Sequence, residues 1–441
     1  MVKELQRICE QVRSRTGKEK AQNLAANINA QTLISIHKET DGNKAPGVDG
    51  VTKADYSVGI MEKLAALEIR MKNEAYKPHA SRRAYIDKPG SGSKRPLGIS
   101  CYEDKLVEKA VAQLMEIVYE PIFCGFSYGY RPGRSCHQAL GKLIDEIQRH
   151  KVSFVVEADI RSFFDTLDHE WLIKFLEHDI ADRKFIGIIR RLLKAGVMEE
   201  GHLLDSEQGT PQGGGASAIL ANVYLHYALD LWFIHMVQKG HFRGEAYLTR
   251  YADDFVCCFQ YRDDAEKFRQ ELTERMAKFG LELATEKTRV LEFGRFAESN
   301  RAAKGLGKPE TFNFLGFTFY CGRSRNKAFF RVKVKSDKEK LNSKLKKCGI
   351  WIRAKRHVMD VKSIIQKLNQ SLVGYYNYYA VSDNSPSLNS FRTGVIRLLF
   401  KWLNRRSQKR SYSWIDFNSR ILAKFPIARP RIKHKMFGHA C

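Results

Sequence analysis

Three aspartates stand where apolar stretches of the chain meet polar ones. Asp159 closes the apolar run 153–158, and Asp253 and Asp254 separate two further apolar runs. An unpaired charge is costly in apolar surroundings, so such acids often hold a cation. Phosphoryl transfer between nucleotides uses two divalent cations ~3.5–4 Å apart, and carboxylates at the ends of adjacent strands supply the oxygen ligands that Mg²⁺ prefers. The acids therefore predict metal-dependent phosphoryl transfer.

Each acid also has a plainer explanation. An Asp-Asp pair is most often part of a solvated hairpin turn, and Asp159 could be the N-cap of a helix. The sequence around the acids has to decide between these readings.

The flanking segments predict the elements that would carry the acids. Residues 153–160 indicate a strand with a helix beginning near Asp168, and residues 248–259 indicate two short strands that meet at the acidic turn. Residues 85–99 predict a hairpin with a cationic tip, and residues 312–320 a strand. Helices are expected within residues 1–40, 57–76, 103–119, 216–236, 262–279 and, for the most part, 336–405.

Charge is concentrated near the C-terminus. The formal net charge is +26. Residues 321–441 hold 29 Lys or Arg against 5 Asp or Glu, whereas residues 1–320 hold 46 against 44. The basic residues alternate with aromatic ones, which favours a folded nucleic-acid surface over a membrane surface or a disordered tail. For Tyr375, Tyr376 and Tyr379, helical spacing favours core packing over base stacking.

Cysteine usage and hydropathy suggest a cellular compartment. The nine cysteines form no CxxC pair and no Cys/His spacing of the zinc-site type, so no disulfide framework is expected. No apolar run approaches the ~20 residues of a membrane span, and residues 1–20 lack the apolar segment of a signal peptide. These features predict a soluble cytoplasmic protein with no membrane partner.

Seven sequence blocks, in a fixed order, resemble the reverse transcriptases encoded by bacterial group II introns. The resemblance covers residues 40–425 and is specific because the order of the blocks is kept. The blocks are APGVDGVT (45–52), KRPLGIS (94–100), FSYGYRPGRS (126–135), ADIRSFFDTLDHEWL (158–172), GTPQGGGASAILANVYLHYALD (209–230), RYADDFVCCF (250–259) and GLELATEKTRVLEFG with TFNFLGFTF (280–319).

The resemblance implies an α+β fold, a right-hand polymerase. Its fingers and palm would combine an antiparallel sheet with helices, and its thumb would be a helical maturase domain. The implied divisions are residues 1–100 for an N-terminal extension and fingers, 101–320 for the palm and remaining fingers, 321–410 for the thumb, and 411–441 for a basic nucleic-acid-binding segment without a nuclease domain.

The resemblance also implies a metal site. Asp159 and Asp253 would ligate two Mg²⁺ ions, for which Mn²⁺ could substitute. Asp254 would be the less direct second acid, and the carbonyl of Ile160 would complete one coordination shell.

Nucleotide contacts are implied at six further positions. Phe164 would exclude the 2′-hydroxyl, unless the ring is simply packed in the core. Lys88 and Arg95 on the hairpin would bind the triphosphate with help from Arg82, although a solvated charged turn is the alternative. Gln212 would lie near the nascent base pair, and Lys287 near the primer end or the triphosphate.

The function implied is RNA-directed DNA synthesis together with assistance to intron splicing. The partners would be an RNA template and intron RNA, a DNA primer or target, and deoxynucleoside triphosphates. Two alternatives remain open: a domesticated relative that serves phage defence or DNA repair, and a catalytically silent RNA-binding splicing factor.

Overall fold

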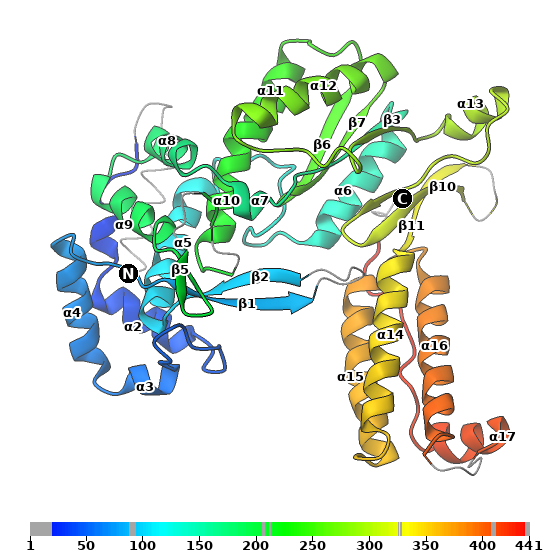
Figure 1. Ribbon diagram of the computed structural model, residues 1–441. Helices are drawn as coiled ribbons and strands as arrows, with labels where there is room; N and C mark the ends of the chain where they lie inside the picture. The colour runs from blue at the N-terminus through cyan, green and yellow to red at the C-terminus, as the bar shows by residue number, and fades with distance from the viewer. Residues whose placement is uncertain are drawn as a thin grey trace.

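The computed structural model describes residues 20–87, 94–204, 208–210, 213–324, 326, 329–406 and 412–436. Three groups of elements are visible in Figure 1: an N-terminal lobe, a central sheet with its covering helices, and a helical bundle that projects from the sheet. The mixture of small sheets and helices agrees with the α+β class expected from the sequence.

The N-terminal lobe is built around a small sheet. β1 (Ser81–Asp87) and β2 (Lys94–Ile99) form the expected hairpin, whose tip lies outside the described residues. β1 also pairs in parallel with β4 (Val197–Glu199), and β4 pairs with β5 (His202–Leu204). The helices of this lobe are η1 (Ala25–Asn27), α2 (Ala30–Glu39), α3 (Lys53–Ser57), α4 (Ile60–Lys72), α5 (Tyr102–Tyr119), α8 (His169–Asp179) and α9 (Arg183–Leu193).

The strands of the central sheet are apolar throughout because both faces of the sheet are buried. Its order is β6 (Ala246–Tyr251), β7 (Asp254–Phe259), β3 (Phe154–Asp159) and β8 (Arg289–Glu292), all antiparallel. Val156 and Cys257 pack in the core shared with the N-terminal lobe, whereas Val155 and Cys258 pack in a second core on the opposite face. A sheet that is buried on both faces needs continuous apolar strands. The helices around it are α6 (Cys136–Arg149), α7 (Phe163–Thr166), α12 (Arg262–Lys278) and α13 (Ala297–Ala303).

A long helix crosses the core beneath this sheet. It consists of α10 (Ser217–Leu225), the π-helical turn η2 (His226–Asp230) and α11 (Leu231–Gln238). Contrary to the expectation from hydropathy, it is long and apolar enough to cross a membrane, and it is the only such helix among the described residues. Because 72% of its most apolar stretch is buried inside the protein, the apolar surface is accounted for by core packing.

The segment expected to be one strand at residues 312–320 is two strands. β9 (Phe312–Phe314) and β10 (Phe317–Arg323) are joined by Leu315 and Gly316, both with positive φ, and β10 pairs with β11 (Phe330–Ser336). An apolar run gives no sign of a tight turn except its glycine, which tolerates this backbone conformation.

The helical bundle contains α14 (Lys338–Lys355), α15 (Val361–Tyr379) and α16 (Ser385–Leu403), followed by α17 (Trp414–Asp416) and η3 (Phe417–Leu422). Tyr375 and Tyr376 are buried, and the ring of Tyr375 stacks on Phe391, so the prediction of core packing is confirmed. The bundle begins at α14. The expected boundary at residue 321 therefore falls inside β10, which belongs to the sheet beside the central core.

Residues 423–436, here called the C-terminal strap, run back from the far end of the bundle to the central core (Figure 1). Ala428 accepts a hydrogen bond from the Tyr376 hydroxyl (3.2 Å), and His434 forms a β-bridge with Val381. Met436 is buried in the core of the central sheet. The basic segment expected from residue 411 onward is thus, where described, packed along the protein.

Candidate active site

Strand register brings the three aspartates to one end of the central sheet. Asp159 is the last residue of β3 and lies opposite Asp254, the first residue of β7. Asp253 lies in the two-residue turn between β6 and β7, where Ala252 has a φ of 57°. Asp159 is not a helix cap, because Ser162 holds the N-cap position of α7. The acids therefore belong to one cluster and not to separate solvated turns.

The electrostatics of this cluster fit a divalent cation. Burial, and next the charge of Asp159, raise the pKa of Asp253. Burial, together with the charges of Asp253 and Asp159, raises the pKa of Asp254 to about 7, although the backbone N–H of Leu315 lowers it. Carboxylates that disfavour one another's ionised form are stabilised by a hard cation between them. The donor set is therefore suitable for Mg²⁺.

Lys287 is brought directly to the acids. Its ammonium group donates a hydrogen bond to Asp159 Oδ2 (2.5 Å), and this bond is the largest cause of a raised pKa for Lys287. The segment before it is fixed by the backbone of β3, since Ala284 N donates to Asp159 O (2.8 Å). Ile160 forms a β-bridge with Leu283, and its side chain is buried. These contacts fix the end of β3 against the segment 283–287.

The two arginines of the hairpin have different surroundings. Arg95 is exposed on β2, and its charge lowers the pKa of Asp253. Arg82 instead donates two hydrogen bonds to the carbonyl of Pro46 (3.2 and 3.0 Å). Arg82 thus anchors the loop that contains APGVDG. Lys88 lies outside the described residues.

Phe163 and Phe164 differ in their burial. Phe163 is buried in the core, whereas Phe164 is half-buried at its edge. The carbonyl of Phe164 accepts a hydrogen bond from Thr210 N (2.7 Å). A Cβ on Gly209 would lie 2.8 Å from that carbonyl oxygen, so the first residues of GTPQGG rest directly on α7. Gln212 lies outside the described residues.

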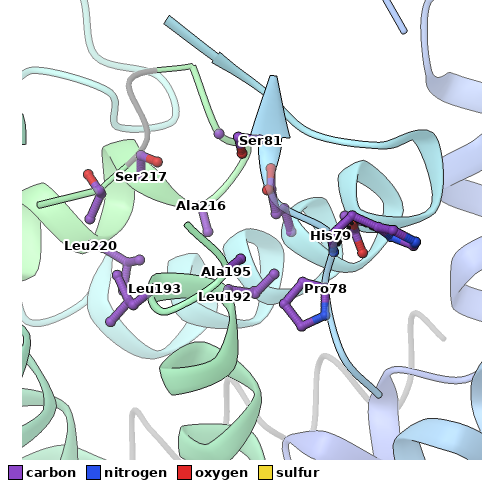
Figure 2. Close-up of a pocket in the computed structure, with 13 residues that line it drawn as sticks. Pro78, His79, Ser81, Leu192, Leu193, Ala195, Ala216, Ser217 and Leu220 are labelled. Atoms are coloured by element: carbon purple, nitrogen blue, oxygen red, sulfur yellow. Dashed lines mark hydrogen bonds and ion pairs between the residues drawn. The ribbon is translucent and has the colours of Figure 1, made fainter. Parts of the chain in front are cut away.

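A cavity is lined in part by the same segment, at Thr210 and Gly214. Figure 2 shows Pro78, His79 and Ser81 facing Ala216, Ser217 and Leu220 across it. Glu108, which also lines it, accepts hydrogen bonds from Gly215 N (2.5 Å) and Ser100 Oγ (2.6 Å). Burial raises the pKa of Glu108. The carboxyl group thereby ties the start of α10 to the N-terminal lobe.

Backbone strain is concentrated around the acids. Among the described residues, eight other than glycine have positive φ, and four of them border this site: Tyr130, Ser162, Ala252 and Leu315. Such conformations cost free energy and persist where the surrounding structure enforces them, which is common at functional sites.

Four polar residues under the acidic turn were not singled out from the sequence. Asn222, His226 and Asp230 lie on the long apolar helix, and Arg250 lies on β6; all four side chains are essentially inaccessible to solvent. The available signal was the spacing of the first three, since i, i+4, i+8 places them on one face of an apolar helix. The burial of Arg250 had no comparable signal.

Comparison with known proteins agrees with the sequence blocks. A family model described as Reverse transcriptase (RNA-dependent DNA polymerase) matches residues 86–319, and one described as Group II intron, maturase-specific domain matches residues 340–417.

Three relatives illustrate the similarity. The Group II intron-encoded protein LtrA of Lactococcus lactis subsp. cremoris is 38% identical over 197 residues, 45% of this chain and 32% of LtrA. Protein YkfC of Escherichia coli is 32% identical over 248 residues, 50% of this chain and 65% of YkfC. An uncharacterized 91 kDa protein in the cob intron of Schizosaccharomyces pombe is 28% identical over 410 residues, 81% of this chain and 49% of that protein. The chain thus spans less than two thirds of the length of each relative.

Proposed function

Because the chain belongs to the family of group II intron-encoded reverse transcriptases with a maturase domain, we propose that it synthesises DNA on an RNA template and assists the splicing of intron RNA. The observation that carries the first activity is the convergence of Asp159, Asp253 and Asp254 at one end of the central sheet. Its partners are an RNA template or intron RNA, a DNA primer or target, and deoxynucleoside triphosphates. In this proposal the N-terminal lobe, central sheet and bundle act as fingers, palm and thumb.

We assign two Mg²⁺ ions, with Mn²⁺ as a substitute, to Asp159 and Asp253, with Asp254 as the second acid and the carbonyl of Ile160 as a further ligand. When bound, the ions would favour ionisation of the attacking hydroxyl and neutralise charge on the leaving group. The raised pKa values of Asp253 and Asp254 support this assignment, since both carboxylates gain from a nearby cation.

The chain's own residues would position the nucleotide. Arg95, with Lys88 of the same hairpin, would hold the triphosphate through charge-assisted hydrogen bonds. Phe164 would exclude the 2′-hydroxyl, a role supported by its position at the edge of the core. Gln212 would contact the nascent pair. Lys287, which donates to Asp159, would lie near the primer end or the triphosphate.

The polymerase proposal is tested by Asp253→Asn in a primer-extension assay on an RNA template with Mg²⁺. We expect the rate to fall by about 10³-fold or more, because the variant lacks one carboxylate ligand of the metal ions. Those ions stabilise the charge of the transition state by several kcal/mol. Asp263→Asn, an exposed acid on α12, is the control and should match wild type. Unimpaired extension by Asp253→Asn contradicts the site. A wild type that promotes splicing but never extends a primer identifies a silent splicing factor.

The maturase proposal is supported by a cluster of cations at the far end of the bundle. Arg353, Arg356, Lys401 and Arg405 surround the ring of Trp402 at 5.3–5.7 Å. Within the described part of the chain, no carboxylate pairs with any of the four. Clustered cations without acidic partners suit a phosphate backbone, and a half-buried indole adds a surface for stacking.

Salt dependence tests this surface. The double variant Arg353→Gln/Arg356→Gln should bind intron RNA less tightly, and the slope of log affinity against log salt should fall by about 1.5, as for two lost phosphate contacts. The control is Arg262→Gln/Arg269→Gln on α12, whose guanidinium groups pair with Glu266. An unchanged slope in the first variant would show that RNA does not bind there.

A further inference from the structure

Arg250 is completely buried directly beneath the acidic turn. Its side chain is 0% exposed, although it is the last residue but one of β6 and only three positions from Asp253. Its backbone is held as well, since Arg250 N donates to Phe126 O (2.9 Å) and Arg250 O accepts from Tyr128 N (2.8 Å). A buried guanidinium needs several partners to offset its desolvation.

Those partners connect the turn to the long helix. Arg250 donates to both carboxylate oxygens of Asp230 (2.8 and 2.5 Å) and to Asn222 Oδ1 (3.0 Å). It also donates to the carbonyl of Ala252 (3.1 Å), the residue with positive φ that precedes Asp253. This side-chain bond from the network to the turn therefore fixes the strained residue of the turn.

The network continues on the other side of the turn. Asn222 Nδ2 donates to the carbonyl of Gly129 (2.7 Å), and Gly129 lies against the amide of Ala252. The turn is thereby enclosed between Arg250 below and the Gly129 segment beside it. Asp230 reaches Arg250 from the end of the π-helical turn η2, an irregularity that often occurs at functional sites.

A metal site beneath the turn is the alternative explanation for these polar groups. Cys124, His226 and Asp230 have potential ligand atoms within 4.8 Å of one another. However, both oxygens of Asp230 already accept hydrogen bonds from Arg250, and a guanidinium beside the ligands would repel a cation. The contacts favour an internal ion pair.

We propose that Arg250, Asp230 and Asn222 form a positioning network for the metal-binding turn. Arg250 holds the Ala252 carbonyl so that Asp253 and Asp254 meet Asp159 in a geometry ready for cations. Lysine could not replace it fully, because one ammonium group cannot serve Asp230, Asn222 and Ala252 in the directions that a planar guanidinium does. The inference rests on the proposed function, since it concerns the same acids.

Two variants separate positioning from stability. Arg250→Lys keeps a cation for Asp230, but it lacks the planar guanidinium that also donates to the Ala252 carbonyl. Asp230→Asn/Arg250→Met removes both charges, so no unpaired charge is left buried. The matched control is Thr249→Val, the neighbouring buried residue of β6, whose hydroxyl donates to Glu146 (2.9 Å) on a different set of partners. Thr249→Val removes a buried hydrogen bond without touching the turn.

The main measurement is Mn²⁺ binding to the 441-residue chain, followed by electron paramagnetic resonance without nucleotide. Thermal unfolding and primer extension on an RNA template accompany it. We expect both Arg250 variants to bind Mn²⁺ about 10–100-fold more weakly and to extend primers about 10²-fold more slowly. Their unfolding temperatures should lie near that of Thr249→Val, which keeps wild-type affinity and rate.

Two results would overturn the proposal. If either Arg250 variant binds Mn²⁺ and extends primers like wild type, the contact with Ala252 is not needed. If Thr249→Val loses as much Mn²⁺ affinity as the Arg250 variants, the effect reflects general loss of stability. A wild-type protein that neither binds Mn²⁺ nor extends primers would instead contradict the proposed function.

Discussion

Gly129 leaves no room for a side chain next to the acidic turn. A Cβ there would lie 2.3 Å from the amide nitrogen of Ala252 and 2.9 Å from the carbonyl carbon of Tyr251. Both atoms belong to the backbone, so the turn itself would have to move. The close approach of this backbone to the turn explains why position 129 of the FSYGYRPGRS block is a glycine.

Gly129→Ala should therefore reduce primer extension by about 10²-fold, because a displacement of about 1 Å misplaces the reacting groups. Gly125→Ala in the same segment is the control, since a Cβ there meets nothing within 4 Å. The measurement is the steady-state rate of primer extension on an RNA template for the two variants. Equal rates for the two variants would mean that the turn tolerates displacement.

At the residue scale, the sequence signal for the cluster of acids was local. Asp159 and the Asp253–Asp254 pair are recognisable because each interrupts an apolar run. The contact of Arg82 with the Pro46 carbonyl could not be predicted, because it depends on how the loop folds over the hairpin; its help in binding the triphosphate stays a prediction. The burial of Arg250 could not be predicted, because an isolated arginine in a sequence is normally exposed.

At the scale of elements, the π-helical turn of the long central helix is stabilised by a side chain of another helix. Arg275 of α12 donates to the carbonyls of Ala228 (2.8 Å) and Tyr227 (3.0 Å), which lie within η2. Burial lowers the pKa of Arg275. The turn that presents Asp230 to Arg250 is thus stabilised by a side chain from another helix.

Arg275→Met should lower the free energy of unfolding by about 1–3 kcal/mol, because two carbonyls lose their donor. Arg269→Met on the same helix removes only a surface pair with Glu266 and should cost less than about 1 kcal/mol. Urea denaturation followed by tryptophan fluorescence measures both. A cost for Arg275→Met no larger than that of the control would contradict the role in η2.

Most elements were predictable, and the exceptions have physical causes. The strands of the central sheet and helices such as α5 and α12 follow from apolar periodicity. The single strand expected at residues 312–320 was wrong because the turn at Leu315 and Gly316 is enforced by contacts from the bundle; the Tyr378 hydroxyl, for example, donates to Leu315 O (2.8 Å). The π-helical turn is likewise a tertiary effect.

At the scale of the whole molecule, the C-terminal strap joins the bundle to the central core. Ile427 is buried in the bundle and Met436 in the core of the central sheet. The ring of His434 stacks on His137 of α6, with centroids 3.6 Å apart. These contacts could not be predicted from composition, which indicated a basic surface for nucleic acid; that use of the segment stays a prediction.

Removal of the strap should loosen the bundle. Truncation after residue 422 deletes two buried apolar side chains, each worth about 1.5–3 kcal/mol, and should make α15 more sensitive to limited proteolysis. Truncation after residue 436 is the control and keeps every contact described. Identical digestion of the two proteins would show that the strap does not stabilise the bundle.

Asn384 joins the near end of the bundle to the sheet beside it. It is fully buried, its Oδ1 accepts from Ser336 N (2.8 Å), and its Nδ2 donates to Ser336 Oγ (2.9 Å). The neighbouring Val381 and the end of the strap reach the same core. Ser336 is the last residue of β11 and Asn384 is the N-cap of α16, so these bonds fix the near end of the bundle to the sheet. Because α16 is about 28 Å long, a tilt of about 5° about this point would displace Trp402 by about 2 Å.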